Sequence, residues 1–432
     1  MMITTYFYGI LIFLSFFMSV YSYFFDKDMF IFSGIFAWIA FLFFFQTLQK
    51  KRLLIFLLIS SFICLIISFY NSFKINFYDI FIVNQYLITL LIGVSFLRLI
   101  SIPKNDNLKG SLNGIKSFIK TYFGVHLFAS IINLSALILV ADKMYKRGYL
   151  TNTQIILLTR SFANDAYWSP FFVAFGTAVV YMPNLDTSII LVNGFFLATF
   201  GFLITYYEVK NDKKNNIKDF EGYPLNLNTL ALPFILAFLV LVTHYLSPDT
   251  KVIVLIALFS FVLTLLILTI RSGFKNCFLE IKKNIFFDLP NMRAEISLFL
   301  VAGIFGVALS SILVGLNLEL PFEKFDWIIA SILLAIFIIL GFIGIHPLIT
   351  IAIIGNLLNE VNHTLLAVTF LMAWSIVIST SPFSGLILTI VSRYNLDIKN
   401  IFRLNIFYIL KIYVLNVIFL FILSKYLNIF LT

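Results

Sequence analysis

Charged residues are scarce in this sequence. Asp, Glu, Lys and Arg make up 12% of its 432 residues, about half of their share in an ordinary soluble domain. Hydrophobic residues account for 61%, more than a water-soluble fold can bury. This composition excludes a cytosolic enzyme and a disordered chain. It predicts an all-α polytopic membrane protein whose outer surface meets the lipid bilayer.

Cysteine and the short motifs of metal and nucleotide chemistry are also missing. The two cysteines, Cys64 and Cys277, lie in stretches of different character, which argues against a disulfide framework and a cysteine metal site. No zinc-protease, Walker or nucleophile-elbow motif occurs. We therefore expect that the protein is not an enzyme and that it holds no cofactor apart from Na⁺ as a coupling ion.

The chain carries an excess of positive charge. Lys and Arg number 30 and Asp and Glu 20, which gives a net charge of +10. No motif that reads bases accompanies them, so nucleic acid is not an expected partner. Basic loops that hold helices on the cytoplasmic side of a membrane explain the excess. The N-terminus lacks a basic start and a cleavage site, and we interpret it as a retained first helix.

Long apolar runs bounded by charges predict about eleven transmembrane helices. They cover residues 4–25, 29–47, 53–70, 81–100, 121–140, 187–207, 229–247, 250–270, 296–316, 364–391 and 404–427.

Two more apolar regions are each interrupted at a proline. Region 149–182 breaks at Pro170, and region 327–358 breaks at Pro347. A membrane helix can break only where protein or a water-filled cavity covers its freed backbone groups, and proline favours such a break. Both regions are predicted as re-entrant helical hairpins, with a kinked or short ordinary helix pair as the alternative.

The distribution of charge supports this arrangement and divides the chain. With the N-terminus inside, most basic residues fall in cytoplasmic segments, although the basic loop 142–147 is placed outside. Amphipathic segments 105–120 and 274–292 are expected along the membrane surface. The expected parts are scaffold helices (1–103), a first repeat core with the first hairpin (104–207), a cytoplasmic linker (208–228), and a second half with the second hairpin and a broken helix at 364–391 (229–432).

The order of these parts indicates two structural repeats, because each amphipathic segment comes one span before a predicted hairpin. We prefer an ungapped alignment of 169–192 with 346–369, since it keeps the order of elements. A rival alignment needs a gap. It pairs Gly124-Val125-His126 with Gly344-Ile345-His346, Ser169-Pro170-Phe171 with Ser381-Pro382-Phe383, and Asn184-Leu185-Asp186 with Asn395-Leu396-Asp397.

Polar residues beside the breaks are the candidate site. Transporters bind solutes at broken helices, where half-helix N-termini attract anions and unwound carbonyls hold cations. The predicted substrate-binding residues are Arg160, Asn164, Ser169, Ser379, Thr380 and Ser381. The predicted coupling-ion or proton residues are Asp165, His346 and Asn356.

Each of these residues has a simpler interpretation. Arg160 and Asp165 are the only opposite charges close together in an apolar setting, but they could pair outside the hydrocarbon. His346 could be a core histidine bonded to a carbonyl, and His126 faces the same choice with less support. The hydroxyls of residues 379–381 could merely satisfy carbonyls freed by the break.

This plan resembles the ion transporter superfamily, which includes divalent anion:Na⁺ symporters. The resemblance rests on the spans, the two hairpins and a broken span after each hairpin, and on Gly344-Ile345-His346-Pro347 and Ser379-Thr380-Ser381-Pro382. The family's Ser-Asn-Thr hairpin signature is absent as such, and the nearest matches are Ser161-Phe162-Ala163-Asn164 and Ser379-Thr380. The family's repeats are inverted, whereas the charge-based span count opens both hairpins outward. Either one span near 142–147 is miscounted or the repeats are parallel.

The expected function is secondary active transport of a small anionic solute by alternating access, coupled to Na⁺ or H⁺, in a bacterial inner membrane. A cation/proton antiporter on the same scaffold is the alternative. A membrane enzyme that handles lipid-linked sugars fits less well, because no external loop is long enough to hold its catalytic residues. A homodimer is left open as the assembly.

Overall fold

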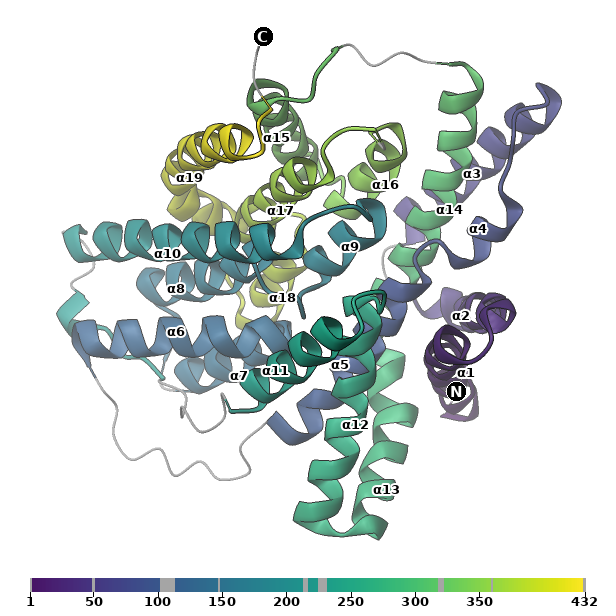
Figure 1. Ribbon diagram of the computed structural model, residues 1–432. Coiled ribbons are helices and arrows are strands. Elements are labelled where there is room, and N and C mark those ends of the chain that lie inside the picture. Colours follow the sequence, from purple (N-terminus) through teal and green to yellow (C-terminus); the bar gives the residue numbers. More distant parts are fainter. Residues whose placement is uncertain are drawn as a thin grey trace. The chain divides into compact units, whose positions relative to one another are not determined.

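The computed structural model describes residues 2–48, 51–101, 113–146, 148–212, 217–223, 231–317, 322–358 and 360–429. These residues are almost all helical and form no β-strand, apart from an isolated bridge between Asn113 and Glu221 (Figure 1). Within them, nine helical segments are long and apolar enough to cross a membrane. The prediction of an all-α, multi-pass membrane protein is therefore confirmed.

The chain forms two compact units, each assembled from separate stretches. Unit 1 comprises Met1–Ile102, Leu232–Pro321 and Ile351–Asn359. Unit 2 comprises Pro103–Ala231, Phe322–Thr350 and Glu360–Thr432. The segment 229–432, treated in the sequence analysis as one half, is thus shared between both units.

Unit 1 is a bundle of apolar helices. Its helix pairs α1 with α2, α5 with α12, and α3 with α14 pack most extensively. A close approach of α5 and α12 requires glycine, because a Cβ atom on Gly93 would lie 2.6 Å from the carbonyl oxygen of Ala257. The elements of this unit are α1 (Met2–Phe24), η1 (Lys27–Met29), α2 (Phe30–Phe44), η2 (Phe45–Thr47), α3 (Lys51–Tyr70), α4 (Phe77–Ile82), α5 (Gln85–Ser101), α11 (Ala231–Leu246), α12 (Val252–Ser272), α13 (Phe274–Lys283) and α14 (Arg293–Gly315).

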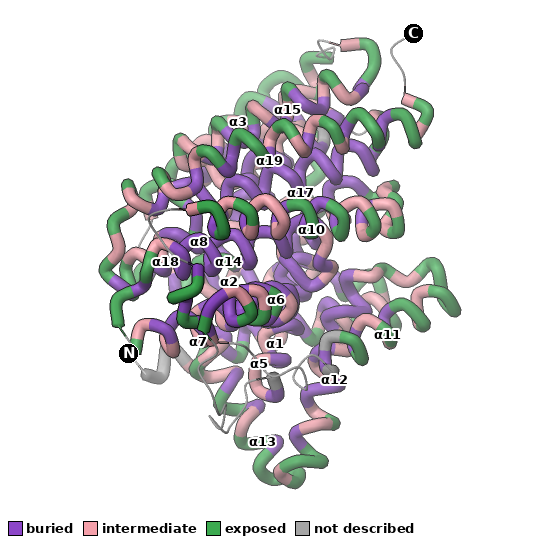
Figure 2. Tube along the Cα trace, turned by 90° about the vertical axis from the view of Figure 1, so that its left-hand side faces the viewer, coloured by how far each residue is buried: buried purple, intermediate pink, exposed green. Residues whose placement is uncertain are grey.

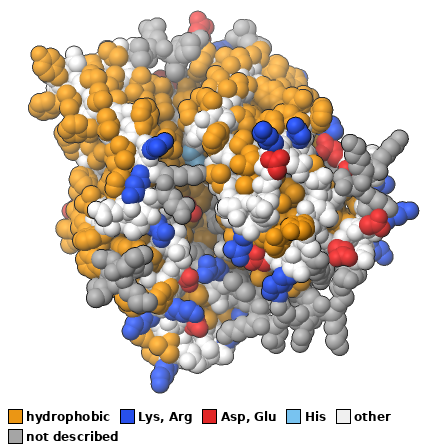
Figure 3. All heavy atoms as spheres, turned by 180° about the vertical axis from the view of Figure 1, so that it is seen from behind, with side chains coloured by type: hydrophobic (Ala, Val, Ile, Leu, Met, Phe, Trp, Pro, Cys, Tyr) orange, Lys and Arg blue, Asp and Glu red, His pale blue; other side chains and the backbone are white. Residues whose placement is uncertain are grey.

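The surface carries many large apolar side chains. On α3, Phe56, Phe62 and Phe69 are more than 60% exposed, as expected of a helix whose solvent is lipid. Figure 3 shows broad hydrophobic areas on one face of the molecule, with Lys, Arg, Asp and Glu gathered outside them.

The predicted amphipathic segment 274–292 is helical throughout, but not as one regular helix. Helix α13 passes into a π-helical turn, η6 (Asn284–Asp288), and then into a 3₁₀ turn, η7 (Leu289–Met292), before α14 begins. Pro290 is the second residue of the 3₁₀ turn. Asp288 pairs with Arg98 of α5 at 3.0 Å, which ties the wide turn to the bundle.

In unit 2 the predicted span 121–140 is wrong, because α6 (Gly114–Ile132) and α7 (Leu134–Tyr145) form a hairpin. Between them Asn133 adopts φ +50°. The start of α6 and the start of α8 both meet the segment 217–223: Asn113 bridges to Glu221, and the Gln154 side chain donates to the Glu221 carbonyl at 2.8 Å. Lys143, at the end of α7, lies over the ring of Tyr223 in the same segment. The chain therefore runs away from the segment 217–223 along α6 and comes back to it along α7.

The region 149–182, predicted as a hairpin, is instead one interrupted helix. It comprises α8 (Asn152–Ala163), a 3₁₀ turn, η3 (Asn164–Tyr167), and α9 (Val173–Tyr181). Helix α17 (His363–Thr380) packs along all three, so they lie in series. Helix α10 (Thr187–Asn211) then runs back beside them: its Gly194 lies against Tyr167, Gly201 against Asn164, and Glu208 pairs with Arg160 (Figure 1). The expected linker at 208 thus begins four residues later, after Asn211.

The second predicted hairpin agrees with the course of the chain. Helix α15 (Trp327–Phe342) runs parallel to α17, since the Phe337 ring packs on Phe370 and Gly341 lies against Val377. The residues between α15 and α17, which include α16 (Pro347–Leu357), must therefore bring the chain back. The unit is completed by η4 (Ile217–Asp219), α18 (Gly385–Tyr394) and α19 (Ile398–Tyr426). Figure 2 shows α17 buried over its length, so this helix is the core of unit 2.

A partly exposed ionic contact joins α7 and α18 in unit 2. The guanidinium of Arg393 donates to both oxygens of Asp142, at 2.8 and 2.7 Å, and the Tyr394 hydroxyl donates to the same carboxylate at 2.8 Å. The hydrogen bonds from Arg393 lower the pKa of Asp142. A carboxyl whose pKa is lowered on folding stabilises the fold above its ordinary value of 3.8 and loses that contribution as the pH falls below it.

We expect Asp142→Asn to lower the free energy of unfolding by about 1 kcal/mol at pH 7, since the pair is partly exposed. The difference between variant and wild type should be smaller at pH 3, which lies below the ordinary value of 3.8, because the unfolded chain then takes up a proton before the folded carboxyl with its lowered pKa does. Denaturant titrations in mixed micelles at both pH values measure this. An equal difference at pH 7 and pH 3 would contradict the assignment.

Candidate functional site

Two helix interruptions in unit 2 are each held by a hydrogen bond of the same kind, from a serine hydroxyl to a backbone carbonyl. At the α8–α9 interruption, the Ser169 hydroxyl donates to the carbonyl of Ser130 in the last turn of α6, at 2.6 Å. At the α17–α18 interruption, the Ser381 hydroxyl donates to the carbonyl of Gly341 in the last turn of α15, at 2.7 Å. Each serine also accepts a backbone N–H from the residue two positions later. Each break is therefore tied to the tip of a hairpin.

A cavity of about 130 Å³ lies where the α15–α16 turn meets the α17–α18 interruption. The predicted site residues His346 and Ser381 line it, with Ser384, Gly385 and Trp374. Helix α16 begins at Pro347 and α18 at Gly385, so the first turns of both helices border this space. Free N–H groups and the helix dipole make such N-termini favourable for negative charge.

His346 itself serves the backbone at the tip of the hairpin. Its Nδ1 accepts the N–H of Leu348 at 3.2 Å, so Nδ1 is unprotonated in this geometry. Its ring stands edge-on to Trp374, with the ring centroids 5.2 Å apart. The histidine thus caps α16 and also lines the cavity.

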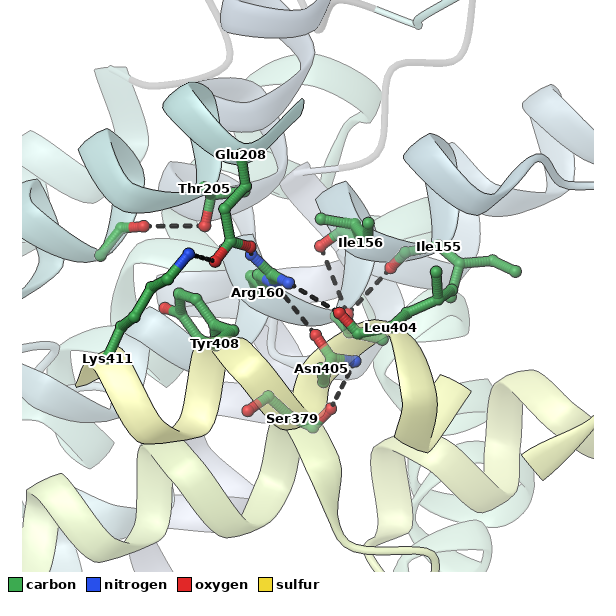
Figure 4. Close-up of polar contacts among 12 residues, drawn as sticks. Ile155, Ile156, Arg160, Thr205, Glu208, Ser379, Leu404, Asn405, Tyr408 and Lys411 are labelled. Carbon is green, nitrogen blue, oxygen red and sulfur yellow. Dashed lines mark hydrogen bonds and ion pairs between the residues drawn. The ribbon is translucent and has the colours of Figure 1, made fainter. Parts of the chain in front are cut away.

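Arg160 is fully buried and its guanidinium is satisfied within the protein (Figure 4). Nε donates to the Asn405 side chain at 2.9 Å, one terminal nitrogen to Glu208 at 2.6 Å, and the other to the Leu404 carbonyl at 2.9 Å. The cation also lies over the Tyr408 ring, 4.0 Å from its centroid. An anion could reach Arg160 only if these partners were displaced, so the predicted anion-binding role finds no support in this arrangement.

Asn164 joins three elements. Its amide donates to the Tyr122 hydroxyl on α6 at 2.7 Å, and its oxygen accepts from the Tyr408 hydroxyl on α19 at 3.3 Å. Gly201 of α10 permits this packing, because a Cβ atom there would lie 2.6 Å from the Asn164 amide nitrogen. The residue is an internal crosslink and does not line the cavity.

Asp165 is fully buried and does not pair with Arg160. One carboxylate oxygen lies 2.8 Å from Nδ1 of His126, which is also 2.9 Å from the Ser161 carbonyl. The Trp168 indole N–H points at Nε2 of the same ring, at 3.1 Å. Apart from the close ionic contact with His126, neither carboxylate oxygen of Asp165 has a hydrogen-bond partner. The contact between His126 and Asp165 could not be expected from sequence, because only the fold brings α6 alongside the interruption.

Of the remaining predicted site residues, Ser379 and Thr380 make hydrogen bonds within their own helix. The Ser379 hydroxyl donates to the Ile376 carbonyl at 2.9 Å, and the Thr380 hydroxyl donates to the same carbonyl. Both therefore satisfy their own helix, which was the simpler interpretation. The side chain of Asn356 lies outside the described residues.

Glu208 and Asn405 were missed from sequence. Glu208 follows an apolar span and was assigned to the linker, although it lies within α10 and pairs with both Arg160 and Lys411. Asn405 is a polar residue in a largely apolar helix, which is itself a signal that a buried polar partner exists. Asn416 lies eleven residues further, three turns along the same face, and is equally buried.

The described residues contain no cluster of three or more His, Cys, Asp or Glu side chains that could hold a metal ion. What they offer is a small cavity bordered by helix N-termini, a buried ionic network and a buried carboxylate–histidine pair. Neither a protein-family model nor a curated protein sequence matches the chain.

We expect Arg160→Met to lower the free energy of unfolding by about 3 kcal/mol, because the Asn405 oxygen and the Leu404 carbonyl would be left buried without a donor. Lys411→Met is the matched control, since it removes the other cation of the same network from a side chain that is 54% exposed. It should cost less than about 1 kcal/mol. Equal losses in a denaturant titration would show that the buried network does not stabilise the fold.

Proposed function

We propose that the protein is a secondary active transporter of a small anionic solute, coupled to Na⁺ or H⁺ by alternating access in a bacterial inner membrane. The observation that carries the proposal is the cavity bounded by a hairpin tip and an interrupted helix. Such breaks, which cost backbone hydrogen bonds in lipid, are typical of solute sites in transporters.

The chemistry of the cavity favours a small anion. The first N–H groups of α16 are already bonded to His346, and the Ser381 and Ser384 hydroxyls, which also line the cavity, donate to the Gly341 and Ile378 carbonyls. The N-terminus of α18, which begins at the cavity-lining Gly385, is therefore the element that suits a carboxylate or a similar oxyanion. This replaces Arg160 as the anion-binding element, because that guanidinium already holds Glu208.

An inverted repeat within unit 2 supports alternating access. The hairpin α6–α7, the interrupted helix α8–α9 and the long helix α10 correspond to α15–α16, α17–α18 and α19. In both sets a Ser-Pro-Phe sequence marks the interruption, and an Asp side chain, Asp186 or Asp397, caps the last helix. This correspondence follows the gapped alignment and not the preferred one.

The two sets point in opposite directions. The backbone N–H of Asn184, at the end of α9, donates to His363 at the start of α17. The far end of α17 reaches α8 through Asn405, which bridges Ser379 and Arg160. Helix α17 is therefore antiparallel to α8–α9. Rocking of one inverted repeat against the other is the usual basis of alternating access.

The topology that follows has eleven crossings: the nine long apolar segments, α11 and the α8–α9 pair. Because α6–α7 is a hairpin and not a span, the basic loop 142–147 moves to the cytoplasmic side. Three of the seven basic residues that the earlier count placed outside thereby become cytoplasmic, in better agreement with the positive-inside rule. The contact between Asp142 and Arg393 then lies on the cytoplasmic side as well.

A cation/proton antiporter is the alternative, and the buried pair of Asp165 and His126 favours it. Both groups can exchange protons, and Arg160 is not available to a substrate anion in this arrangement. A membrane enzyme acting on lipid-linked sugars has less support, since the buried charges lie at helix interruptions and not in an external loop.

Uptake of radiolabelled acetate, succinate and phosphate into proteoliposomes, under imposed Na⁺ or pH gradients, tests the proposal. We expect uptake of at least one anion to depend on a gradient and to stop when an ionophore dissipates it. Gly385→Ala should raise KM several-fold without unfolding the protein, because a Cβ atom at this cavity-lining residue would meet nothing within 4 Å.

Ser392→Ala is the control for this variant, since it removes one atom from the exposed side of the same helix. It should leave KM unchanged. Gradient-independent flux for every anion would overturn the transporter proposal, and an unaltered KM in Gly385→Ala would remove the cavity as its site.

Cysteine labelling tests the revised topology. In a background with Cys64 and Cys277 replaced by serine, exposed positions Lys146→Cys and Ser392→Cys should react with a membrane-impermeant maleimide from the cytoplasmic side only. Lys74→Cys, in the loop between α3 and α4, should react from the opposite side. Labelling of Lys146→Cys and Lys74→Cys from the same side would restore the original span count.

A further inference from the structure

The ring of His126 has a defined protonation state in this structure. An indole N–H can only donate, so the Trp168 contact at 3.1 Å requires Nε2 to be an acceptor. The proton of the neutral ring then resides on Nδ1, which faces the Asp165 carboxylate at 2.8 Å and the Ser161 carbonyl at 2.9 Å. The ring has no further nitrogen that could take up a proton without loss of a contact.

The other ionisable groups near this pair already have partners or differ in kind. Tyr122 on α6, Tyr167 on η3 and Tyr408 on α19 are phenols, and the nearest cation, Arg160 on α8, is bound to Glu208 on α10. Helix α9 contributes only Tyr181, and α17 has no ionisable residue after His363. Among the described residues, His126 is thus the only ionisable group that contacts Asp165.

From this geometry we propose that His126 and Asp165 form the binding site of the coupling ion, and that this ion is a proton. The inference rests on the proposed function and selects H⁺ over Na⁺. A sodium ion needs several oxygen ligands, as other hard cations do. Here the Asp165 carboxylate has the His126 ring nitrogen as its close ionic contact, and the described residues hold no second carboxylate that would complete a cluster of three ligands.

Proton uptake from water changes the net charge of the pair from −1 to 0. The incoming proton binds Nε2, which converts the ring to an imidazolium beside the Asp165 carboxylate. A buried carboxylate without a countercharge is costly, so this neutralisation is favourable. The Trp168 indole N–H then faces another N–H donor and must move away.

Displacement of Trp168 would couple protonation of His126 to the geometry of the α8–α9 interruption. Trp168 immediately precedes Ser169, whose hydroxyl ties the α8–α9 interruption to the tip of the α6–α7 hairpin at Ser130. Gly194 of α10 lies against the Tyr167 backbone and the Trp168 Cβ atom. A shift of the indole therefore acts on the hairpin and on α10 together, which are the parts that would have to move in transport.

The test is equilibrium proton binding, measured without any substrate. Solid-state NMR of ¹⁵N-histidine-labelled protein in liposomes reports the state of each ring nitrogen as the pH is varied, and His126→Gln assigns the signal among the four histidines. We expect an unprotonated Nε2 and a protonated Nδ1 at high pH, and an imidazolium at low pH.

Two variants and one control define the expected shifts. Asp165→Asn should weaken proton binding by His126 tenfold or more, because the countercharge is lost. Trp168→Phe should strengthen it several-fold, because the indole no longer competes for Nε2, and this smaller change keeps the test informative if Asp165→Asn fails to fold. Asp142→Asn, which removes an exposed carboxylate from the same unit, should leave the midpoint unchanged.

Three results would overturn the proposal: a midpoint of His126 that Trp168→Phe does not move, a protonated Nε2 at high pH, or displacement of the proton by 100 mM Na⁺ at constant ionic strength. Because the measurement needs no solute, it separates the two proposals. Normal proton binding without any flux would refute the transporter. Gradient-driven flux with an inert His126 would refute only the proton site.

Discussion

A broken helix in an apolar surrounding must find partners for the peptide groups it frees, and this constraint organises unit 2. Water cannot supply them within lipid. At each interruption a serine hydroxyl instead accepts a backbone N–H of the broken helix and donates to a carbonyl in the last turn of a neighbouring hairpin helix. A hydroxyl that joins two elements also fixes where they meet. The cavity at the α17–α18 interruption and the carboxylate–histidine pair near the α8–α9 interruption both depend on these two contacts.

The buried charges obey a related rule, since each must be paired or neutralised. Arg160 contacts a carboxylate, an amide, a carbonyl and an aromatic face, all of which belong to the folded protein. Asp165 finds a single histidine and keeps one oxygen without a partner. In the first arrangement every guanidinium nitrogen already donates to the protein, whereas the second leaves a group whose protonation state can change. Two charged residues that are five positions apart in sequence thus differ in how far the fold occupies their hydrogen-bonding groups.

Much of the helical plan could be predicted, because apolar runs and prolines are local signals. The segments between residues 4 and 100 were predicted correctly as helices, and the interruptions at Ser169 and Ser381 occur where prolines follow them. The prediction failed at Asn133, where no proline marks the chain reversal and the apolar run continues through it. Asparagine tolerates positive φ, but the residue type alone does not reveal that the chain turns there.

By itself, the sequence determined that this chain is helical, apolar and interrupted, since those properties follow from composition and from residues that break helices. Only the tertiary structure decided which interruption is a hairpin and which is a crossing. That depends on contacts between distant parts of the chain, such as those that the starts of α6 and α8 make with the segment 217–223. The tertiary structure also decided the partners of Arg160, Asp165 and His126. Ion pairing acts through space over a few ångströms, and separation along the chain carries little information about such distances.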